Sequence, residues 1–232
     1  MIQHLWIIMD WNRRWAKSKF LPTFAWHKAW ADNARKITKL CDHKWIKYLT
    51  LWALSTENLQ KRWEDEVRWI IKLVNNIESY LVEMIEKWLK FQTIWDISKL
   101  PKESQDILNS VIKKTENNSW IVLTLALIYW WQDEIMRWMK KFIIENKDKQ
   151  NFEELVKNLE PKTFRNYLDT VKLPLPDVIV RTGWDVRHSG FLLFDSDYSE
   201  YYFTQKWWPA FNEEELDNVI DFFKTSKRNF GK

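Results

Sequence analysis

HLWIIMDWNRRWAK, residues 4–17, is the stretch that decides the fold. Its apolar run, residues 5–9, ends abruptly at Asp10 and is followed by Asn12 and two arginines. An apolar run of this length is typical of a buried parallel strand, and ligands of open α/β sheets bind beyond the carboxyl ends of such strands. A carboxylate beside guanidinium groups indicates a site for a magnesium-bound phosphate. Asp10 alone would be interpreted as part of a solvated turn.

The composition indicates a single globular domain spanning residues 1–232. Hydrophobic residues make up 46% of the chain, which argues against disorder. Cys41 is the only cysteine, so the chain has no internal disulfide or cysteine-rich zinc site, and it fits a reducing compartment. No apolar segment reaches membrane-spanning length, and the first residues lack a signal-peptide pattern. We expect a cytoplasmic protein, with peripheral contact at the inner face of the membrane left open.

Hydrophobic periodicity predicts an α/β fold, with strands and helices alternating along the chain. We expect a single-domain, mostly parallel six-stranded sheet flanked by helices. The expected strands are residues 5–9, 48–54, 91–94, 121–129, 178–181 and 200–203. The expected helices are residues 27–42, 65–90, 133–144 and 213–223, with a further helix opened by Pro101 and a helical patch over residues 152–168.

Polar side chains cluster at the strand boundaries. Those after the first, second and fifth strands are Asp10, Asn12, Arg14, Ser55, Thr56, Glu57, Asn58, Arg62, Arg181, Asp185, Arg187 and Ser189. Glu200 opens the sixth strand. We expect these groups to meet at one rim of the sheet and to form an anion site. The net charge of +4 fits anionic partners without choosing among diphosphates, lipid surfaces and nucleic acid.

Several motifs resemble the cis-prenyltransferases, the family typified by undecaprenyl diphosphate synthase. MDWNRRWAK, residues 9–17, is similar to the family's MDGNGRWAK or MDGNRRWAK, and WHKAW, residues 26–30, to GHKAG. LTLWALSTEN, residues 49–58, resembles LTLYAFSTEN, and VRTGWDVRHSGFLLF, residues 180–194, resembles IRTSGExRLSNFLLW. IYWWQDEI, YSEYYF and WPAF resemble NYGGRxEI, YAELYF and WPDF in the same order.

The resemblance implies an Mg²⁺-dependent enzyme that condenses isopentenyl diphosphate with an allylic diphosphate, usually farnesyl diphosphate. The product would be a long Z-polyprenyl diphosphate, the precursor of a cell-envelope carrier lipid. Asp10 and Asn58 would be catalytic, and Asp10 and Glu200 would hold the metal. The substrate-binding residues would be Trp11, Asn12, Arg13, Arg14, Trp15, His27, Ser55, Thr56, Glu57, Arg62, Arg181, Arg187, His188 and Ser189.

The resemblance also implies an apolar tunnel for the growing chain and a homodimer. We expect the apolar stripe of residues 65–90 and the second strand to form the tunnel walls, although most of that stripe also suits ordinary core packing. The basic tail, residues 224–232, suits a solvated terminus, an anionic membrane surface or a dimer partner's site. His4 and His188 suit local hydrogen bonds better than metal binding, since no zinc-type spacing is present.

The chain departs from the family pattern at Thr23, Gln132 and Leu59, where the family has arginine, arginine and an aromatic residue. Its other anomaly is 18 tryptophans against 3 glycines, where average usage would give about 16 glycines. We hypothesise that UGA codons read as glycine were translated as tryptophan. The twelve positions are Trp6, Trp11, Trp26, Trp30, Trp45, Trp63, Trp88, Trp95, Trp120, Trp130, Trp131 and Trp184. Trp15, Trp52 and Trp208 match aromatic positions, and Trp69, Trp138 and Trp207 stay open.

Two other functions compete with this interpretation. A non-catalytic, membrane-associated subunit of the same family should lack the metal carboxylate or the arginine cluster, and this chain keeps both. A nucleic-acid binder is supported by net charge alone, without a recognised motif or a strong basic run. We therefore expect no nucleic-acid partner.

Overall fold

The computed structural model describes residues 1–10, 20, 23–53, 64–94, 97–127, 129–191 and 193–227. Its strands are β1 (His4–Ile8), β2 (Tyr48–Trp52), β3 (Leu89–Ile94), β4 (Ile121–Ala126), β5 (Val178–Arg181) and β6 (Glu200–Phe203). Its helices are α2 (Thr23–His43), α4 (Glu64–Asn75), α5 (Ile77–Lys87), α6 (Lys102–Lys114), α7 (Trp131–Asn146), α8 (Phe152–Lys157), α9 (Pro161–Arg165) and α10 (Glu213–Thr225). Short 3-10 turns are η1 (Ile97–Lys99), η2 (Leu193–Asp195) and η3 (Trp208–Ala210).

The strands form one six-stranded sheet in the order β3-β4-β2-β1-β5-β6, and every neighbouring pair is parallel. β1 lies between β2 and β5, and all five of its residues are buried. Its last residue, Ile8, pairs with Trp52 of β2 and with Arg181 of β5. The predicted α/β class and the parallel sheet are confirmed. A strand buried on both faces reads as a continuous apolar run, which is why this pattern was visible in the sequence.

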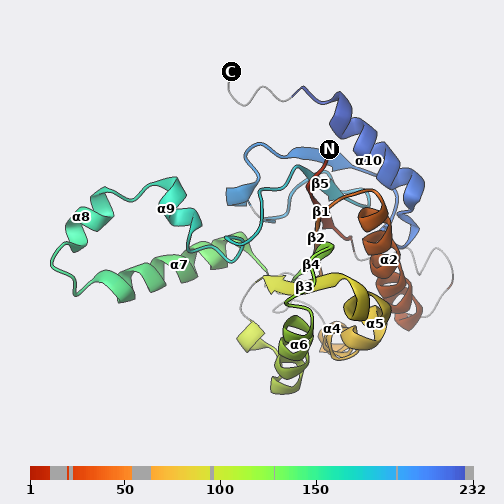
Figure 1. The fold of residues 1–232 in the computed structure, drawn as a ribbon, viewed down its shortest axis with the longest axis horizontal. Helices are drawn as coiled ribbons and strands as arrows, with labels where there is room; N and C mark the ends of the chain where they lie inside the picture. Colours follow the sequence, from red (N-terminus) through yellow and green to blue (C-terminus); the bar gives the residue numbers. More distant parts are fainter. Residues whose placement is uncertain are drawn as a thin grey trace.

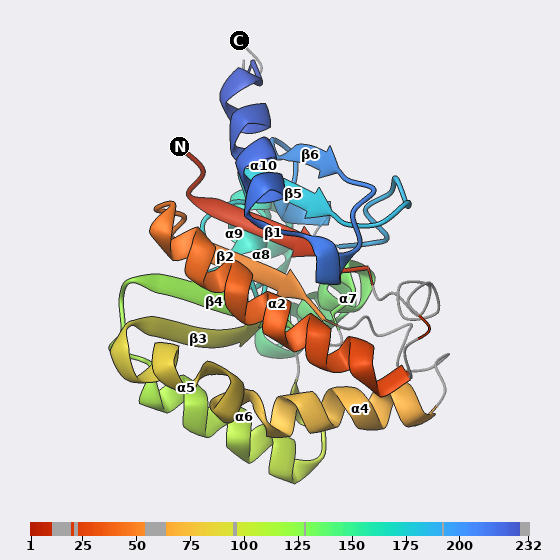
Figure 2. The ribbon, with the colours of Figure 1, turned by 90° about the vertical axis from the view of Figure 1, so that its right-hand side faces the viewer.

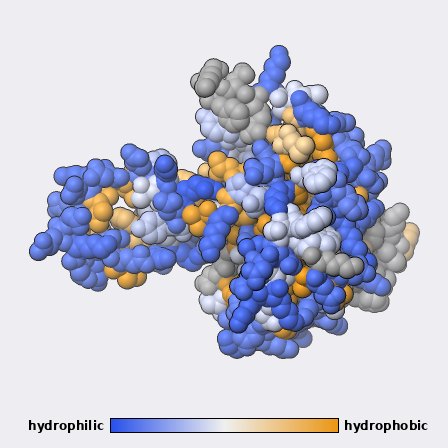
Figure 3. Space-filling model, in the orientation of Figure 1, coloured by the Kyte–Doolittle hydropathy of each residue, from blue (hydrophilic) through white to orange (hydrophobic). Residues whose placement is uncertain are grey.

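Helices cover both faces of the sheet, and one helix leaves it. α2 and α10 lie on one side, while α4, α5 and α6 pack together beside the β3 edge (Figures 1 and 2). α7 starts on the opposite side and extends away from the body as an arm that ends in α8 and α9 (Figure 1). In the space-filling view the surface of this arm is mainly hydrophilic, with scattered apolar residues (Figure 3). In the described part of the chain, no helix is both long and apolar enough to cross a membrane.

The prediction of one continuous helix over residues 65–90 was wrong, because the structure has two helices there. α4 ends at Asn75 and α5 begins at Ile77, with Asn76 between them. The Asn76 side chain donates to the Lys72 carbonyl over 2.7 Å, and the Ser79 hydroxyl donates to the Asn76 carbonyl over 2.8 Å. Such side-chain bonds compete with the helical backbone pattern and interrupt it.

The end of α2 is closed by a Schellman motif with tryptophan at its turning residue. The Ile46 N–H donates to the Cys41 carbonyl over 2.9 Å, and the Trp45 N–H donates to the Asp42 carbonyl over 3.0 Å. Trp45 adopts a φ of 62° and its side chain is 77% exposed. This position normally holds glycine, because a Cβ is disfavoured in left-handed backbone.

Candidate functional site

The carboxyl ends of β1 and β5 are tied together immediately beyond their last paired residues. The Thr182 N–H donates to the Ile8 carbonyl over 3.2 Å, and the Thr182 hydroxyl accepts a bond of 3.1 Å from the Asp10 N–H. These bonds fix the backbone of Asp10 at the rim of the sheet. Its carboxylate consequently faces residues that follow β5.

Arg181, the last residue of β5, is buried and uses all five of its N–H groups within this site. Nε and Nη2 donate to the two carboxylate oxygens of Asp10, each over 3.3 Å, and Nη2 also donates to Asp185 over 3.1 Å. Nη1 donates to the Arg187 carbonyl and, over 2.6 Å, to the Ser189 hydroxyl. A fully satisfied guanidinium with only 4% of its side chain exposed organises this loop as well as neutralising Asp10.

A second arginine completes the cluster from the solvent side. Both terminal nitrogens of Arg187 donate to the carboxylate of Asp185, each over 2.8 Å, and 62% of the Arg187 side chain is exposed. Asp185 therefore bridges a buried and an exposed guanidinium. The exposed one is open to an anion arriving from solvent.

Burial is the main influence on the carboxyl group of Asp10. Desolvation raises its pKa above the ordinary value, while the charge and the hydrogen bonds of Arg181 oppose that shift. Asp185 also raises this pKa, and Arg187 lowers it. Asp10 is a desolvated acid whose charge depends on nearby cations.

Backbone conformations with positive φ bring the loop after β5 close to Asp10. Gly183 has a φ of 92°, and a Cβ at that position would lie 2.8 Å from Asp10 Oδ2. Ser189, whose hydroxyl binds Arg181, has a φ of 50°. Gly183 is therefore required by both its backbone and the carboxylate beside it.

The predicted rim is only partly visible. The structure brings together Asp10, Arg181, Asp185, Arg187 and Ser189, as expected. Trp11, Asn12, Arg13, Arg14, Trp15, Ser55, Thr56, Glu57, Asn58 and Arg62 lie outside the described residues. His27 lies in the first turns of α2, where the structure describes only the backbone.

Glu200 does not lie at this rim within one chain, and that expectation was wrong. It is the first residue of β6 and pairs with Val178, the first residue of β5, so it lies at the amino end of the sheet. In a parallel sheet the two ends of a strand face opposite edges, and the sequence pattern alone did not show which end Glu200 occupies. Among the described residues, no three His, Cys, Asp or Glu side chains are grouped closely enough to hold a metal ion.

The residues present still fit Mg²⁺ carried by a phosphate ligand. Mg²⁺ keeps several waters and is commonly bound by one or two carboxylates together with substrate phosphates. Asp10 supplies one partly desolvated carboxylate. Its oxygens contact the guanidinium of Arg181, which could bind phosphate oxygens in their place.

The sequence pattern placed Asp185 in the expected anion site, but it assigned no role to Thr182 or Gly183. All three belong to the string TGWD, residues 182–185, that follows β5, so the signal was present. The histidines behave as expected. His188 Nδ1 accepts a local bond of 3.0 Å from the Gly190 N–H, and His4 bonds to the Pro174 carbonyl over 2.7 Å. Burial lowers the pKa of His4 to about 3.

A buried carboxyl group lies where β4 leads into the arm. Glu134 accepts hydrogen bonds from the Tyr129 hydroxyl, over 2.5 Å, and from the Asp169 N–H, over 2.9 Å. Desolvation raises the pKa of Glu134 to about 7, and the negative charges of Asp169 and Asp195 act in the same direction.

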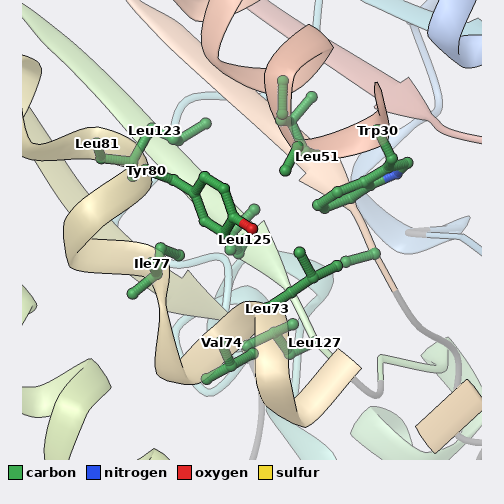
Figure 4. A pocket seen from close by; sticks show the side chains of 13 residues that line it. Trp30, Leu51, Leu73, Val74, Ile77, Tyr80, Leu81, Leu123, Leu125 and Leu127 are labelled. Carbon is green, nitrogen blue, oxygen red and sulfur yellow. The ribbon is translucent and has the colours of Figure 1, made fainter. Parts of the chain in front are cut away.

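An apolar pocket lies between the sheet and its helical cover (Figure 4). β2, β4, α2, α4 and α5 contribute its walls, and every lining side chain except Trp30 and Tyr80 is aliphatic. The lining includes Val74, Ile77 and Leu81 from the apolar stripe noted in the sequence. Its free space amounts to about 50 Å³.

The sequence matches a family model described as "Putative undecaprenyl diphosphate synthase" over residues 8–231. It is 39% identical to the isoprenyl transferase of Clostridium perfringens, covering 100% of this chain and 90% of the relative. It is 36% identical to a protein of Micrococcus luteus named ditrans,polycis-undecaprenyl-diphosphate synthase ((2E,6E)-farnesyl-diphosphate specific), covering 99% and 91% of the two chains.

Two solved structures share the whole fold. One is lavandulyl diphosphate synthase from Lavandula x intermedia in complex with dimethylallyl diphosphate, with a TM-score of 0.91 and 28% identity, covering 100% of this chain and 98% of the other. The other is a "probable undecaprenyl diphosphate synthase" from Campylobacter jejuni, with a TM-score of 0.76 and 30% identity, covering 100% and 99%.

Proposed function

We propose, since this chain belongs to the prenyltransferase family of undecaprenyl diphosphate synthases, that it condenses isopentenyl diphosphate with an allylic diphosphate. Farnesyl diphosphate is the starter that we favour, because the Micrococcus luteus relative is named for it. The product is a long-chain Z-polyprenyl diphosphate that serves as precursor of a cell-envelope carrier lipid.

The observation that carries this proposal is the charged cluster of Asp10, Arg181, Asp185 and Arg187 at the carboxyl edge of the sheet. In the reaction the allylic C–O bond breaks and diphosphate leaves with its electron pair. A carbon–carbon bond forms to C4, the terminal alkene carbon of isopentenyl diphosphate. One proton leaves C2, and its C–H electron pair forms the new double bond between C2 and C3. Negative charge grows on the leaving diphosphate, and fixed cations stabilise that change.

The residues divide between the two diphosphates. Arg187 and Ser189 hold isopentenyl diphosphate, and Arg181 joins them when the incoming anion replaces one of its protein partners. Asp10 would hold Mg²⁺, which supplies charge neutralisation for the diphosphates. Asn58, with Ser55, positions a water or a diphosphate oxygen to accept the proton, because an amide is a poor base. Glu200 as a second metal carboxylate stays a prediction.

The apolar pocket supports the proposal because it suits the hydrocarbon part of the substrate. Apart from Trp30 and Tyr80, its lining consists of Leu, Ile, Val and Ala side chains, which offer no partner to a charged ligand. A prenyl chain gains about 0.8 kcal/mol for each CH₂ removed from water, so such walls favour its binding. The homodimer and the peripheral membrane contact belong to the same proposal.

We also propose that the natural polypeptide carries glycine at the twelve tryptophan positions. Trp45 gives the strongest support, because it occupies the turning residue of a Schellman motif with left-handed backbone. UGG codons at these positions in the gene would refute the recoding. The mass of the natural peptide spanning residue 45 tests the same point on the protein itself.

The test is magnesium-dependent incorporation of labelled isopentenyl diphosphate into butanol-extractable lipid, with farnesyl diphosphate as starter. The chain with the twelve positions restored to glycine is the material. We expect incorporation, with Asp10→Asn lowering it by about a thousandfold and Asp148→Asn, an exposed residue of the arm, leaving it unchanged. Failure of the folded protein with several allylic starters would refute the proposal in favour of a non-catalytic subunit.

A further inference from the structure

The turn that follows β6 holds the backbone beside Asp10. The Thr204 N–H donates to the Arg181 carbonyl over 3.0 Å. The Gly183 N–H donates to the Lys206 carbonyl over 2.9 Å. A Cβ on Gly183 would lie 2.8 Å from Asp10 Oδ2, so the backbone of Gly183 directly adjoins that carboxylate. The position of the turn therefore determines how closely the loop after β5 approaches Asp10.

A buried carboxylate, that of Glu215, ties this turn to α10, which lies beside β6 (Figure 2). Its Oε1 accepts from the Tyr202 hydroxyl over 3.1 Å, and its Oε2 lies 3.0 Å from Lys206 Nζ. The Thr204 hydroxyl also bonds to this carboxylate, and it accepts from the Lys206 N–H over 3.2 Å. Only 7% of the Glu215 side chain is exposed. Glu215 therefore binds the strand, its end and the turn at once.

Capping of α10 does not account for this carboxylate. Asn212 is the N-cap residue, and its side chain accepts from the Glu215 N–H over 3.1 Å. In a capping box, a glutamate at this position turns back to the backbone N–H of the N-cap residue. The Glu215 carboxylate instead contacts β6 and the turn that follows it. Its side chain therefore serves the turn, while its backbone serves the helix.

The contacts of Glu215 require a charged acceptor. Its partners are an ammonium group and two hydroxyls, and an ionised carboxylate can accept from all three. An amide in its place would turn an NH₂ group toward at least one of these donors. Burial by itself would raise the pKa of Glu215, but the bonds from Thr204, Lys206 and Tyr202 outweigh burial and lower it. The carboxylate therefore stays ionised at neutral pH.

We infer that Glu215 is a positioning residue for the diphosphate site, because it holds the turn that sets Gly183 against Asp10. It acts through the backbone of that turn and not through contact with a substrate. The inference rests on the proposed function for the identity of the ligand, magnesium diphosphate. It adds a residue outside the charged cluster that determines how well Asp10 is placed to bind that ligand.

The first experiment measures binding without catalysis. Inorganic pyrophosphate is titrated by calorimetry, in the presence of Mg²⁺, into the chain used for the incorporation assay and into its Glu215→Gln variant. We expect Glu215→Gln to bind about tenfold more weakly, as is typical when a group that orients a metal ligand is altered. Glu214→Gln is the matched control, because Glu214 also lies 3.5 Å from Lys206 Nζ but is 76% exposed, and its affinity should not change. Equal affinities in the parent and in folded Glu215→Gln would overturn the inference.

Two variants at Thr204 separate positioning from a general loss of stability. Thr204→Val removes the hydroxyl that bonds to Glu215 and to the Lys206 N–H, whereas Thr204→Ser keeps it. We expect Thr204→Val to weaken pyrophosphate binding and Thr204→Ser to bind like the parent. The inference fails if Thr204→Val binds as tightly as Thr204→Ser, and this comparison decides it even where Glu215→Gln does not fold.

The second experiment measures the Mg²⁺ concentration that gives half-maximal incorporation of isopentenyl diphosphate. We expect Glu215→Gln to need about tenfold more Mg²⁺ and to recover most of the parent's rate at saturation. A rate lowered by the same factor at every Mg²⁺ concentration would indicate a smaller folded fraction and would overturn the inference. A parent that binds pyrophosphate but incorporates no isopentenyl diphosphate would refute the proposed enzyme, and weaker pyrophosphate binding by Glu215→Gln would still support the inference.

Discussion

The two edges of the sheet are stabilised by different kinds of contact. At the amino edge, the Asp177 carboxylate accepts from the backbone N–H groups of Gln3 and His4 over 2.7 and 3.1 Å, and the Trp45 turn closes α2. At the carboxyl edge, charged side chains bind one another, with Arg181 between Asp10 and Asp185. The amino edge satisfies its own backbone, whereas the carboxyl edge concentrates charge.

The difference shows that this fold places its buried charged groups at the carboxyl edge of the sheet. Burying an ion pair gives little net stability, because desolvation of the charges offsets their attraction. Asp10 and Arg181 are therefore poorly explained as a structural device, and they are well explained as a prepared anion site. If the contrast is real, substitutions at the carboxyl edge should have large effects, and those at the amino edge small ones.

Arg181→Gln should have the largest effect. It removes a buried cation and leaves Asp10 and Asp185 without it, so we expect a loss of about 3–5 kcal/mol in the free energy of unfolding, measured by urea denaturation. Arg187→Gln is the matched control. Its side chain is 62% exposed, and its loss should stay below about 1 kcal/mol. Equal losses in the two variants would contradict the assignment of Arg181 as the organising residue.

Glu134 should make stability depend on pH. Its folded pKa of about 7 lies above the ordinary 4.5, so the folded protein holds this proton more tightly than the unfolded chain. The stabilising contribution of Glu134 is fully present below about pH 4.5 and is lost as the pH rises toward about 7. Relative to Glu134→Gln, we expect the wild type to lose about 3 kcal/mol across this range. Parallel pH profiles of the two proteins would show that Glu134 does not titrate there.

Gly183→Ala should cost about 2 kcal/mol of stability, because its φ of 92° is unfavourable for any side chain. Its Cβ would also press on the Asp10 carboxylate, which lies 2.8 Å away. We expect the rate of prenyl transfer to fall by a larger factor than the equilibrium constant for folding. An Asp10→Ala background should reduce the stability cost, because it removes the carboxylate from that contact. Full additivity in this double-mutant cycle would rule out the contact as the cause.

Trp45→Gly should have the smallest effect and the opposite sign. Glycine relieves the left-handed backbone at this residue, so thermal and urea unfolding should show a gain of about 1 kcal/mol. Trp45→Ala should gain nothing, because its Cβ keeps the same penalty. Trp120→Gly should gain nothing either, because Trp120 is not among the described residues with positive φ. Equal gains in all three would point to a general effect of removing exposed indoles.

Much of the fold could be predicted, because buried parallel strands are continuous apolar runs. β5 and β6 have the predicted boundaries, and β1 is shifted by one residue. The break at Asn76 could not be predicted from the apolar stripe, because that stripe continues through the break. A side chain that bonds to the local backbone ended the helix there.

The sequence predicted which residues belong to the candidate site but only part of their arrangement. Residues just after β1 and β5 had to meet, because neighbouring parallel strands end at the same edge. The use of all five Arg181 donors depends on the path of the loop through Gly183 and Ser189, which periodicity does not describe. Glu200 was misplaced because the residue that opens a parallel strand lies at the opposite edge from those that follow one.

The position of β1 in the sheet also affects the order in which contacts form during synthesis and folding. β1 is the first strand to leave the ribosome, yet one of its two neighbours is β5, and Asp10 must wait for Arg181, 171 residues later. β1 to β4 can associate once residue 126 has emerged, because they are neighbours in the sheet. Contacts between distant residues form slowly, since the loop between them must first close. We expect pulse-labelled hydrogen exchange to protect β2 and β4 first, so that the edge intended for chemistry is completed last.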